Sequence, residues 1–257
     1  MFACAQLVGQ ELVTPSRLTW ASSLEEELEW LAGEGMGMRM PTVAGASRFE
    51  QQSVQAPASV AVVTRDEILK YGHRSLGDIL RSVRGFNTNA DGVVMTLGVR
   101  GYSDPHDLNT RILILIDGHR LNENIYDVVP VDHVLPIDIA MIERVEVLHG
   151  PASSLYGSNA FLAVINIITR TGADVDGLEV SGTYGTFDTH STRVTYGGKM
   201  ENGLELLLSA TLYESRGDTP YLPEYATRAR NFGYGIQNME RDTNLMLKLA
   251  YEDWALQ

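Results

Sequence analysis

Residues 144–157 read Arg144-Val-Glu-Val-Leu-His-Gly-Pro-Ala-Ser-Ser-Leu-Tyr-Gly157, and residues 163–169 read Ala-Val-Ile-Asn-Ile-Ile-Thr. The first part of the longer stretch and most of the shorter one are rich in β-branched residues, which predicts two strands. Gly150-Pro151 ends the first strand, because proline fixes φ and glycine permits a positive φ. We expect Gly150-Pro151 and Tyr156-Gly157 to set a tight packed turn, which is an architectural role.

Upstream of this block, residues 58–85 carry a strand followed by two helices. Val60–Val63 is a mostly β-branched run that predicts a strand. Thr64 and Glu67 form a capping box for a helix that Gly72 ends. The second helix is capped by Ser75, and its apolar positions recur at helical spacing on one face: Leu76, Ile79, Leu80 and Val83. Gly85 stands where a C-cap glycine is expected.

Between the helices and the quoted block, two further strands are predicted at Val93–Arg100 and Arg111–Ile116. The Asp117-Gly118 pair that follows is a strong hairpin-turn signal. Pro136–Ile142 is typical of a helical turn. Residues 53–172 therefore form, by prediction, one α+β domain.

After Gly172 the hydrophobic period becomes two. Leu178, Val180 and Tyr184 fall on one face of the first segment, while Glu179, Ser181 and Thr183 fall on the other. The alternation continues through residues 194–196, 204–212 and 245–251. Segments of about ten alternating residues are typical of barrel strands. Residues 173–257 are thus expected to form about four antiparallel strands of a β-barrel.

Residues 1–52 are interpreted as an N-terminal extension. Ser23 with Glu26 makes a capping box for a short amphipathic helix that runs to Leu31. Residues 33–47 have glycine, proline and methionine without periodicity, which indicates an extended segment. The apolar start, residues 1–9, is either a signal remnant, a misplaced start or an ordinary apolar N-terminus.

Composition excludes several classes of function. The chain has 20 basic and 33 acidic residues, a net charge of −13, and no long Lys or Arg run, so nucleic acid is not expected as a partner. The single cysteine, Cys4, excludes an internal disulfide and a thiolate metal cluster. No G-x-S-x-G elbow, G-x-G-x-x-G or Walker loop is present, and we expect neither enzyme activity nor a cofactor. The longest aliphatic run, Ile112–Ile116, is too short for a membrane-spanning helix.

The block at residues 144–169 closely resembles the signature of TonB-dependent receptor plug domains. Leu97–Gly101 and Ile112–Leu121 resemble the two upstream plug motifs, in the same order, and Ala56–Ile68 is similar to a plug start. The resemblance extends over about residues 41–257. Two positions depart from the family pattern: His149 stands where arginine is usual, in a plug-to-barrel charge pair, and Ala163 where glycine is frequent.

This resemblance implies an α+β plug domain followed by antiparallel strands of an incomplete transmembrane β-barrel. It implies an outer-membrane receptor, its plug toward the periplasm, that takes up a scarce siderophore, cobalamin or other metal chelate and is driven by a TonB-type energy-coupling protein. Residues 42–47 are similar to the box that pairs with TonB by strand addition, although an ordinary linker has the same composition. The candidate box consists of Thr42, Val43, Ala44, Gly45, Ala46 and Ser47.

Two sets of candidate site residues follow. The plug-motif set is Arg100, Gly101, Asp117, Gly118, Arg144, Glu146, Gly150, Pro151, Tyr156, Gly157 and Asn166. Within it, Arg100 and Asp117 lie at apolar strand ends, where burial requires a charged partner. The resemblance pairs Arg100 with barrel glutamates, while Asp117 is equally explained by the turn.

The second set lies in two loops, residues 102–110 and 122–133, that the resemblance turns toward ligand, although polar surface loops have this composition too. It consists of Tyr102, Asp104, His106, Asp107, Asn109, Asn122, Asn124, Tyr126 and Asp127. No pair of histidines has the spacing of a dedicated metal site.

A closed barrel of about 22 strands of about ten residues needs roughly 220 residues before loops, and residues 171–257 number 87. The expectation is therefore a fragment or a truncated gene product, since an open barrel edge leaves backbone groups unpaired. The alternative is a periplasmic plug-like binding module with a small sheet and no channel. Whether the reading frame continues past Gln257 discriminates the two.

Overall fold

The computed structural model describes residues 42–43, 51–52, 59–90, 94–104, 106–132, 134–218, 239–251 and 254–256. The chain divides into two units, Met1–Pro41 and Thr42–Gln257, and every described residue lies in the second. The predicted helix from Ser23 to Leu31 lies outside the described residues. Strands β1 (Thr42–Val43) and β2 (Gln51–Gln52) pair with each other in antiparallel fashion.

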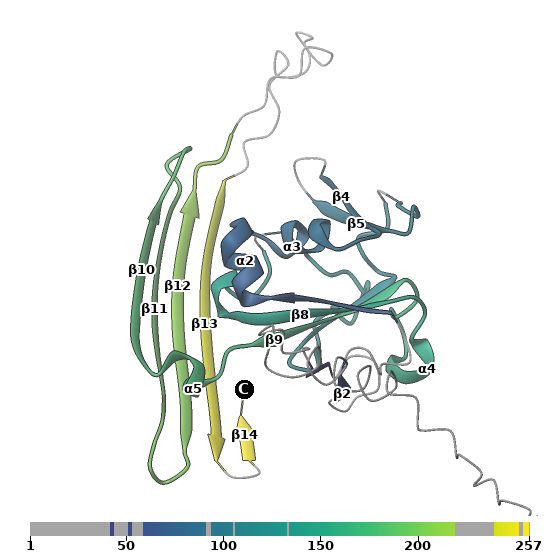
Figure 1. The fold of residues 1–257 in the computed structure, drawn as a ribbon. Helices are drawn as coiled ribbons and strands as arrows, with labels where there is room; N and C mark the ends of the chain where they lie inside the picture. Colours follow the sequence, from purple (N-terminus) through teal and green to yellow (C-terminus); the bar gives the residue numbers. More distant parts are fainter. Residues whose placement is uncertain are drawn as a thin grey trace, which may run out of the picture. The chain divides into compact units, whose positions relative to one another are not determined.

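The α+β domain is built on a five-stranded sheet of order β3-β8-β9-β6-β7 (Figure 1). Strands β6 and β9 run parallel, and the other neighbours are antiparallel. The predicted strands at residues 60–63, 111–116, 144–148 and 164–169 are confirmed. The observed bounds are β3 Val60–Thr64, β6 Ile112–Ile116, β7 His119–Arg120, β8 Ile142–His149 and β9 Ala163–Thr169.

Helices α2 (Arg65–Tyr71) and α3 (Leu76–Ser82) cover one face of this sheet. The Thr64–Glu67 capping box is present, and Gly72 ends α2 with a φ of 67°. The predicted apolar face of α3 is buried in the core against Val145, Val147, Ile165 and Ile167 of the sheet. Gly85 is not the C-cap of α3, because the helix ends at Ser82 and Val83 caps it in an extended conformation.

Shorter elements surround the sheet. Strand β4 (Phe86–Ala90), which the alternation did not predict, pairs with β5 (Met95–Val99), which it did. A 3₁₀ turn, η2 (Ile139–Met141), lies within the predicted helical turn. Helix α4 (Ser153–Tyr156) follows Gly150-Pro151, and Ala152, Ala160 and Tyr156 belong to a second apolar cluster with Leu113, Leu115, Leu148 and Val164.

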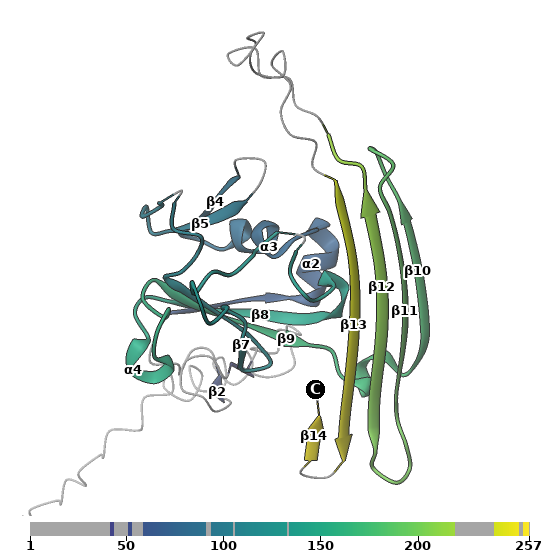
Figure 2. The same ribbon diagram turned by 180° about the vertical axis from the view of Figure 1, so that it is seen from behind.

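The second sheet begins after α5 (Gly172–Val175) and has the order β10-β11-β12-β13-β14, with all neighbours antiparallel (Figure 2). Four of its strands confirm the alternating segments, and the short fifth, β14, was not predicted. Their bounds are β10 Gly177–Tyr184, β11 His190–Lys199, β12 Glu205–Ser215, β13 Glu240–Tyr251 and β14 Trp254–Leu256. None of the described helices is both long and apolar enough to cross a membrane.

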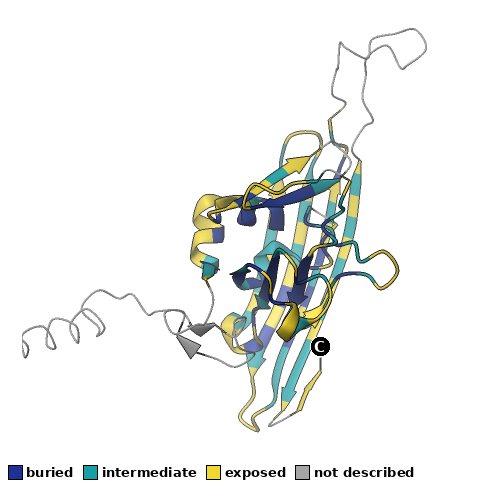
Figure 3. Cartoon of the chain, turned by 90° about the vertical axis from the view of Figure 1, so that its right-hand side faces the viewer, coloured by how far each residue is buried: buried dark blue, intermediate teal, exposed yellow. Residues whose placement is uncertain are grey.

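The two sheets distribute their apolar side chains differently (Figure 3). The α+β domain buries them, whereas the second sheet exposes those of one face, among them Leu178, Val180, Leu208 and Leu245. Its other face carries polar residues that lie against the α+β domain, including Thr195, Ser209 and Thr211, each at most 5% exposed. The alternation along the strands therefore separates an outward apolar face from an inner polar face.

Candidate functional site

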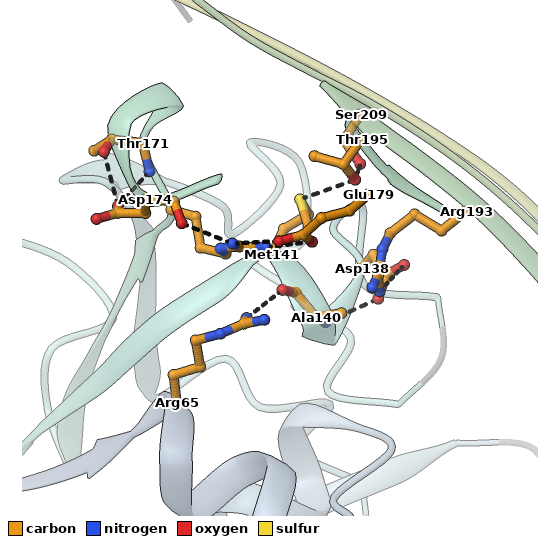
Figure 4. A network of polar contacts seen from close by, with 11 residues as sticks. Arg65, Asp138, Ala140, Met141, Thr171, Asp174, Glu179, Arg193, Thr195 and Ser209 are labelled. Atoms are coloured by element: carbon orange, nitrogen blue, oxygen red, sulfur yellow. Dashed lines mark hydrogen bonds and ion pairs between the residues drawn. The ribbon is translucent and has the colours of Figure 1, made fainter. Parts of the chain in front are cut away.

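Polar and charged side chains join the α+β domain to the inner face of the second sheet (Figure 4). This interface has three centres, at Asp138, Arg170 and Asp117. Between them, Thr195 and Ser209 share a hydrogen bond of 2.9 Å on neighbouring strands β11 and β12, fully enclosed by the domain. The interface is built from residues far apart in the chain, so its geometry depends on how the α+β domain and the second sheet pack.

Asp138 is the first centre, and it caps η2 by accepting a hydrogen bond from the backbone N–H of Ala140 (2.8 Å). Its second carboxylate oxygen accepts from Thr211 Oγ1 at 2.8 Å and lies 3.5 Å from Arg193 Nη1. One carboxylate therefore caps the start of a turn of the domain and contacts two strands of the sheet. Because both Asp138 and Arg193 are mostly buried, this ion pair is poorly screened by water.

Arg170 is the second centre and lies in the link from β9 to the second sheet. Only 4% of its side chain is exposed, and it forms a bidentate pair with Glu179 of β10, at 2.9 Å for both bonds. It also donates to the backbone carbonyl of Asp174 at 3.0 Å. The hydrogen bond to Glu179 raises the pKa of Arg170 above its ordinary value. This pair holds the first strand of the sheet to the end of the domain.

Arg65, at the start of α2, adds a further cation to this region. It donates to the carbonyl of Ala140 at 2.6 Å. Burial lowers the pKa of Arg65 from its ordinary value, and the nearby charge of Arg170 lowers it further. The interface thus brings several guanidinium groups close together around a few carboxylates. Each carboxylate there therefore attracts the neighbouring guanidinium groups as well as its direct partner.

Asp117 is the third centre, and both sequence interpretations of it hold. Asp117 and Gly118 have φ values of 47° and 83° and form the two-residue loop between β6 and β7, as predicted. The Asp117 carboxylate also accepts from the backbone N–H of Thr169 (2.9 Å) and pairs with Lys248 Nζ of β13 at 2.8 Å. Sequence reasoning missed Lys248, because nothing in the local pattern distinguishes it from a solvated lysine.

The pairing of Arg100 with barrel glutamates stays a prediction. Arg100 and Gly101 occupy a two-residue turn between Val99 and Tyr102, with φ values of 52° and 83°. The Arg100 side chain is exposed, and it forms no ion pair with a glutamate among the described residues. Among the described residues, the charge pairs between the α+β domain and the second sheet are made by Asp117, Asp138 and Arg170.

Other plug-motif residues lie in the strands and turns of the α+β domain. Glu146 of β8 is 1% exposed and accepts a hydrogen bond from Arg144 Nε at 2.9 Å. Its cross-strand neighbour Asn166 accepts from the backbone N–H of Gly118 at 3.3 Å. Gly150 and Gly157 have φ values of 105° and 79°, which non-glycine residues rarely adopt.

His149 and the candidate TonB box complete the motif positions. The His149 ring lies against Phe86, with ring centroids 5.4 Å apart, and its Nε2 is 3.0 Å from the carbonyl oxygen of Arg84. It therefore contacts its own domain. Thr42 and Val43 form β1, and residues 44–47 of the box lie outside the described residues.

Two members of the loop set, Asn109 and Asn122, are buried. Asn109 is 3% exposed and accepts from the N–H of Leu97 while donating to the carbonyls of Met95 and Val129. Asn122 is equally buried, and it accepts from Ile114 N–H and donates to the carbonyls of Ile112 and Asp127. Their amides are used to hold the loops, because a buried amide without partners is costly.

The remaining loop residues are wholly or partly accessible. Tyr102 is 40% exposed beneath the guanidinium of Arg111, which also pairs with Asp107. Asp104 accepts from the N–H of His106, and Asp127 pairs with Arg120. Asn124 is exposed, and Tyr126 is 76% exposed.

Glu123 holds the tip of the second loop by accepting from the backbone N–H groups of Ile125 and Tyr126. The Tyr126 ring and its neighbour Ile125 therefore project from a turn whose backbone is fixed. Among the described residues, no group of three or more His, Cys, Asp or Glu side chains could hold a metal ion.

Known proteins are similar to this chain over much of its length. Residues 52–164 match the family model described as TonB-dependent Receptor Plug Domain. The chain is 30% identical over 221 residues to the vitamin B12 transporter BtuB of Vibrio vulnificus (strain CMCP6). The aligned region covers 85% of this chain and 34% of that protein. The chain thus spans about a third of this relative's length.

Solved structures show the same fold. The pyoverdine outer membrane receptor FpvA from Pseudomonas aeruginosa PAO1 has 23% identity and a TM-score of 0.57, over 72% of this chain and 26% of that chain. The ferric yersiniabactin uptake receptor FyuA from Yersinia pestis has 23% identity and a TM-score of 0.55, over 76% and 29% of the two chains. The Vibrio vulnificus relative is named as a transporter, and the two solved structures are named as receptors.

Proposed function

Residues 52–164 of this chain belong to the TonB-dependent receptor plug domain family, and from this premise we propose that the protein takes up a metal chelate across the outer membrane. In this proposal, residues 53–172 are the plug and residues 173–257 contribute barrel strands. The transported ligand is cobalamin or a ferric siderophore, the ligand classes in the names of the relatives. No bond is broken, so the protein couples two binding events and is not an enzyme.

The single observation that carries this proposal is the outward face of the second sheet. The strand register aligns Leu178, Tyr196, Leu208 and Leu247 in one row across β10–β13. Val180, Val194, Ala210 and Leu245 form the next row. A continuous apolar face with a polar opposite face is the pattern of a membrane barrel wall.

The same observation disfavours a periplasmic binding module. In water, Leu178, Val180 and Leu245, which are 66%, 68% and 75% exposed, would form a large apolar patch that promotes aggregation. In lipid, these side chains need no further cover. We therefore prefer the membrane receptor to the water-soluble module.

The proposal assigns two contacts to the plug. A TonB-type protein would pair with the extended segment that includes Thr42 and Val43, by strand addition. The chelate would contact the accessible loop residues, in particular Tyr126, whose ring is exposed on a turn that is hydrogen-bonded to Glu123. Asp117, Asp138 and Arg170 would hold the plug against the barrel wall while both partners bind.

The test is deletion, in its own bacterium, of the gene that encodes this chain, followed by measurement of the uptake of labelled cobalamin and of labelled ferric siderophores. We expect uptake of one of these chelates to be lost and to return when the gene is supplied on a plasmid. A matched strain carrying a Tyr126→Ala gene should show weaker uptake with the protein still present in the outer membrane. Unchanged uptake of every chelate in the deletion strain would reject the proposal.

A further inference from the structure

The link between the α+β domain and the second sheet is folded. It runs from Arg170 to Gly177 and contains α5. The Thr171 N–H and hydroxyl both donate to the Asp174 carboxylate at 2.7 Å, which closes a capping box at the start of α5 (Figure 4). Arg170 also donates to the Asp174 carbonyl at 3.0 Å. Because these bonds close its turn, the link is a compact joint and not an extended tether.

Two glycines bring this link into direct contact with the sheet. A Cβ on Gly172 would lie 2.2 Å from the Leu206 carbonyl oxygen, and a Cβ on Gly197 would lie 2.6 Å from Val175 Cβ. Neither glycine has a positive φ, so the backbone conformation does not require them. The close approach of the link to the strands does require them, because any side chain would occupy the contact. Helix α5 therefore lies directly on β11 and β12.

Three strands of the second sheet hold the link. Arg170 forms its bidentate pair with Glu179 of β10. Gly197 supplies the contact on β11. On β12, the Glu205 carboxylate accepts a hydrogen bond from the Ala173 N–H at 3.0 Å. The link is therefore attached to β10, β11 and β12 at once, through an ion pair, a backbone contact and a hydrogen bond.

The N-terminal end of the α+β domain is attached differently. Strand β3 is the edge strand of its sheet, with β8 as its neighbour. Arg170, in contrast, is bonded to the second sheet through its side chain and to the Met141 carbonyl of the domain through its backbone N–H, at 2.9 Å. Separating β3 breaks one strand pairing. Separating the link breaks contacts with three strands and leaves the charges of Arg170 and Glu179 without each other, which is costly for a buried pair.

We propose that residues 170–177 are a fixed anchor, which stays on β10, β11 and β12 during uptake while the plug opens on the N-terminal side of β9. This inference rests on the proposed function, in which a TonB-type protein pairs with the segment that includes Thr42 and Val43. Force applied to that segment reaches β3 first, because β3 is the next strand of the chain after β2. Gly172 and Gly197 are then positioning residues, which act through the placement of α5 and not through contact with the chelate.

Crosslinking in the deletion strain, with the gene supplied on a plasmid, tests the anchor. All variants carry Cys4→Ser, so that the introduced cysteines are the only ones among these residues. Ala173→Cys with Glu205→Cys places one pair across the anchor. Ser59→Cys with His149→Cys places the matched pair between the start of β3 and the end of β8, where the Ser59 carbonyl accepts from the His149 N–H at 3.0 Å. Cells are treated with a short bismaleimide, and chelate uptake is measured before and after.

Crosslinking across the anchor should leave uptake unchanged, because the crosslinked groups do not separate, and crosslinking of β3 to β8 should abolish uptake. Mass spectrometry of peptides from the same cells gives the crosslinked fraction. Loss of uptake in the first variant would overturn the anchor, and unchanged uptake in the second would overturn opening on the N-terminal side of β9. In both cases the cells transport the chelate before treatment, so the proposed function stands. Cells with the unchanged gene that take up no chelate would overturn the proposed function itself.

Two adjacent glycines of β11 supply a second test. Gly197→Val directs a side chain into Val175 and should detach α5, whereas a Cβ on Gly198 meets no atom within 4 Å, so Gly198→Val should leave α5 in place. A detached link lets the TonB-type protein pull the whole plug. Gly197→Val cells should therefore become sensitive to vancomycin, which an intact outer membrane excludes, and should lose this sensitivity when the gene for the TonB-type protein is deleted. Equal sensitivity of the two variants, at equal amounts of chain in the outer membrane, would contradict the anchor.

Discussion

The α+β domain and the second sheet contain similar apolar strand residues, but the domain buries them and the second sheet exposes them. Val145, Val147, Ile165 and Ile167 of the domain are fully buried under two helices. Leu178, Val180 and Leu245 of the second sheet are at least 66% exposed, and its polar side chains turn inward. Strand alternation sets which residues share a face, while the neighbouring layer decides whether that face is buried or exposed.

The largest expected effect concerns the buried layer. Leu80→Ala removes a fully buried side chain of α3 and should lower the free energy of unfolding by about 2–5 kcal/mol. Leu69→Ala, on the exposed side of α2, should change it by less than about 0.5 kcal/mol. Pulse proteolysis of the full chain in detergent across a urea series measures both, and equal effects would contradict the assigned core.

The next effect tests the outward face. Leu245→Arg places a charge at the middle of β13 on the apolar face and should cost about 2–4 kcal/mol in a bilayer. Asn244→Arg, the adjacent inward position, is the control and should retain more protein in the membrane. The measurement is the amount of folded chain in isolated outer membranes, and equal losses would show that the two faces are not distinguished by lipid.

The third effect lies where the two regions meet. Asp117→Asn leaves Lys248 without its ion-pair partner and should cost roughly 1–3 kcal/mol. In a double-mutant cycle, adding Lys248→Met should recover part of this loss, because the unpaired charge is removed as well. Urea unfolding in detergent supplies all four free energies.

The pair Arg216–Asp188, whose side chains are 73% and 46% exposed, is the matched control. Asp188→Asn should change the free energy of unfolding by less than about 1 kcal/mol. If the two pairs were equally weak, Asp117 would act only as a turn residue.

The smallest effect on stability separates the two kinds of loop residue. Tyr126→Ala should change the free energy of unfolding by less than about 0.5 kcal/mol, since the ring is exposed. Asn109→Ala, in contrast, should cost about 1–3 kcal/mol by leaving buried backbone groups unpaired. Thermal unfolding and chelate binding, measured on the same samples, should change separately in the two variants.

Local signals in the sequence were sufficient for much of the fold. The Thr64–Glu67 capping box, the Gly72 stop and the Asp117-Gly118 turn involve neighbours within a few residues, so their physics is complete in a short window. Strand β4 escaped prediction because three polar residues, Asn87, Thr88 and Asn89, separate Phe86 from Ala90. Its strand state comes from pairing with β5, which a single segment does not reveal.

By itself, the sequence determined the longer helices and strands, the plug motifs and the change to a period of two after Gly172, because each depends on near neighbours. Only the tertiary structure decided that Asp117 meets Lys248, that Arg100 is exposed, and that Asn109 and Asn122 bond the backbone. Packing between distant segments determines which charged residues meet across a sheet interface. The sequence around each residue therefore does not identify its partner.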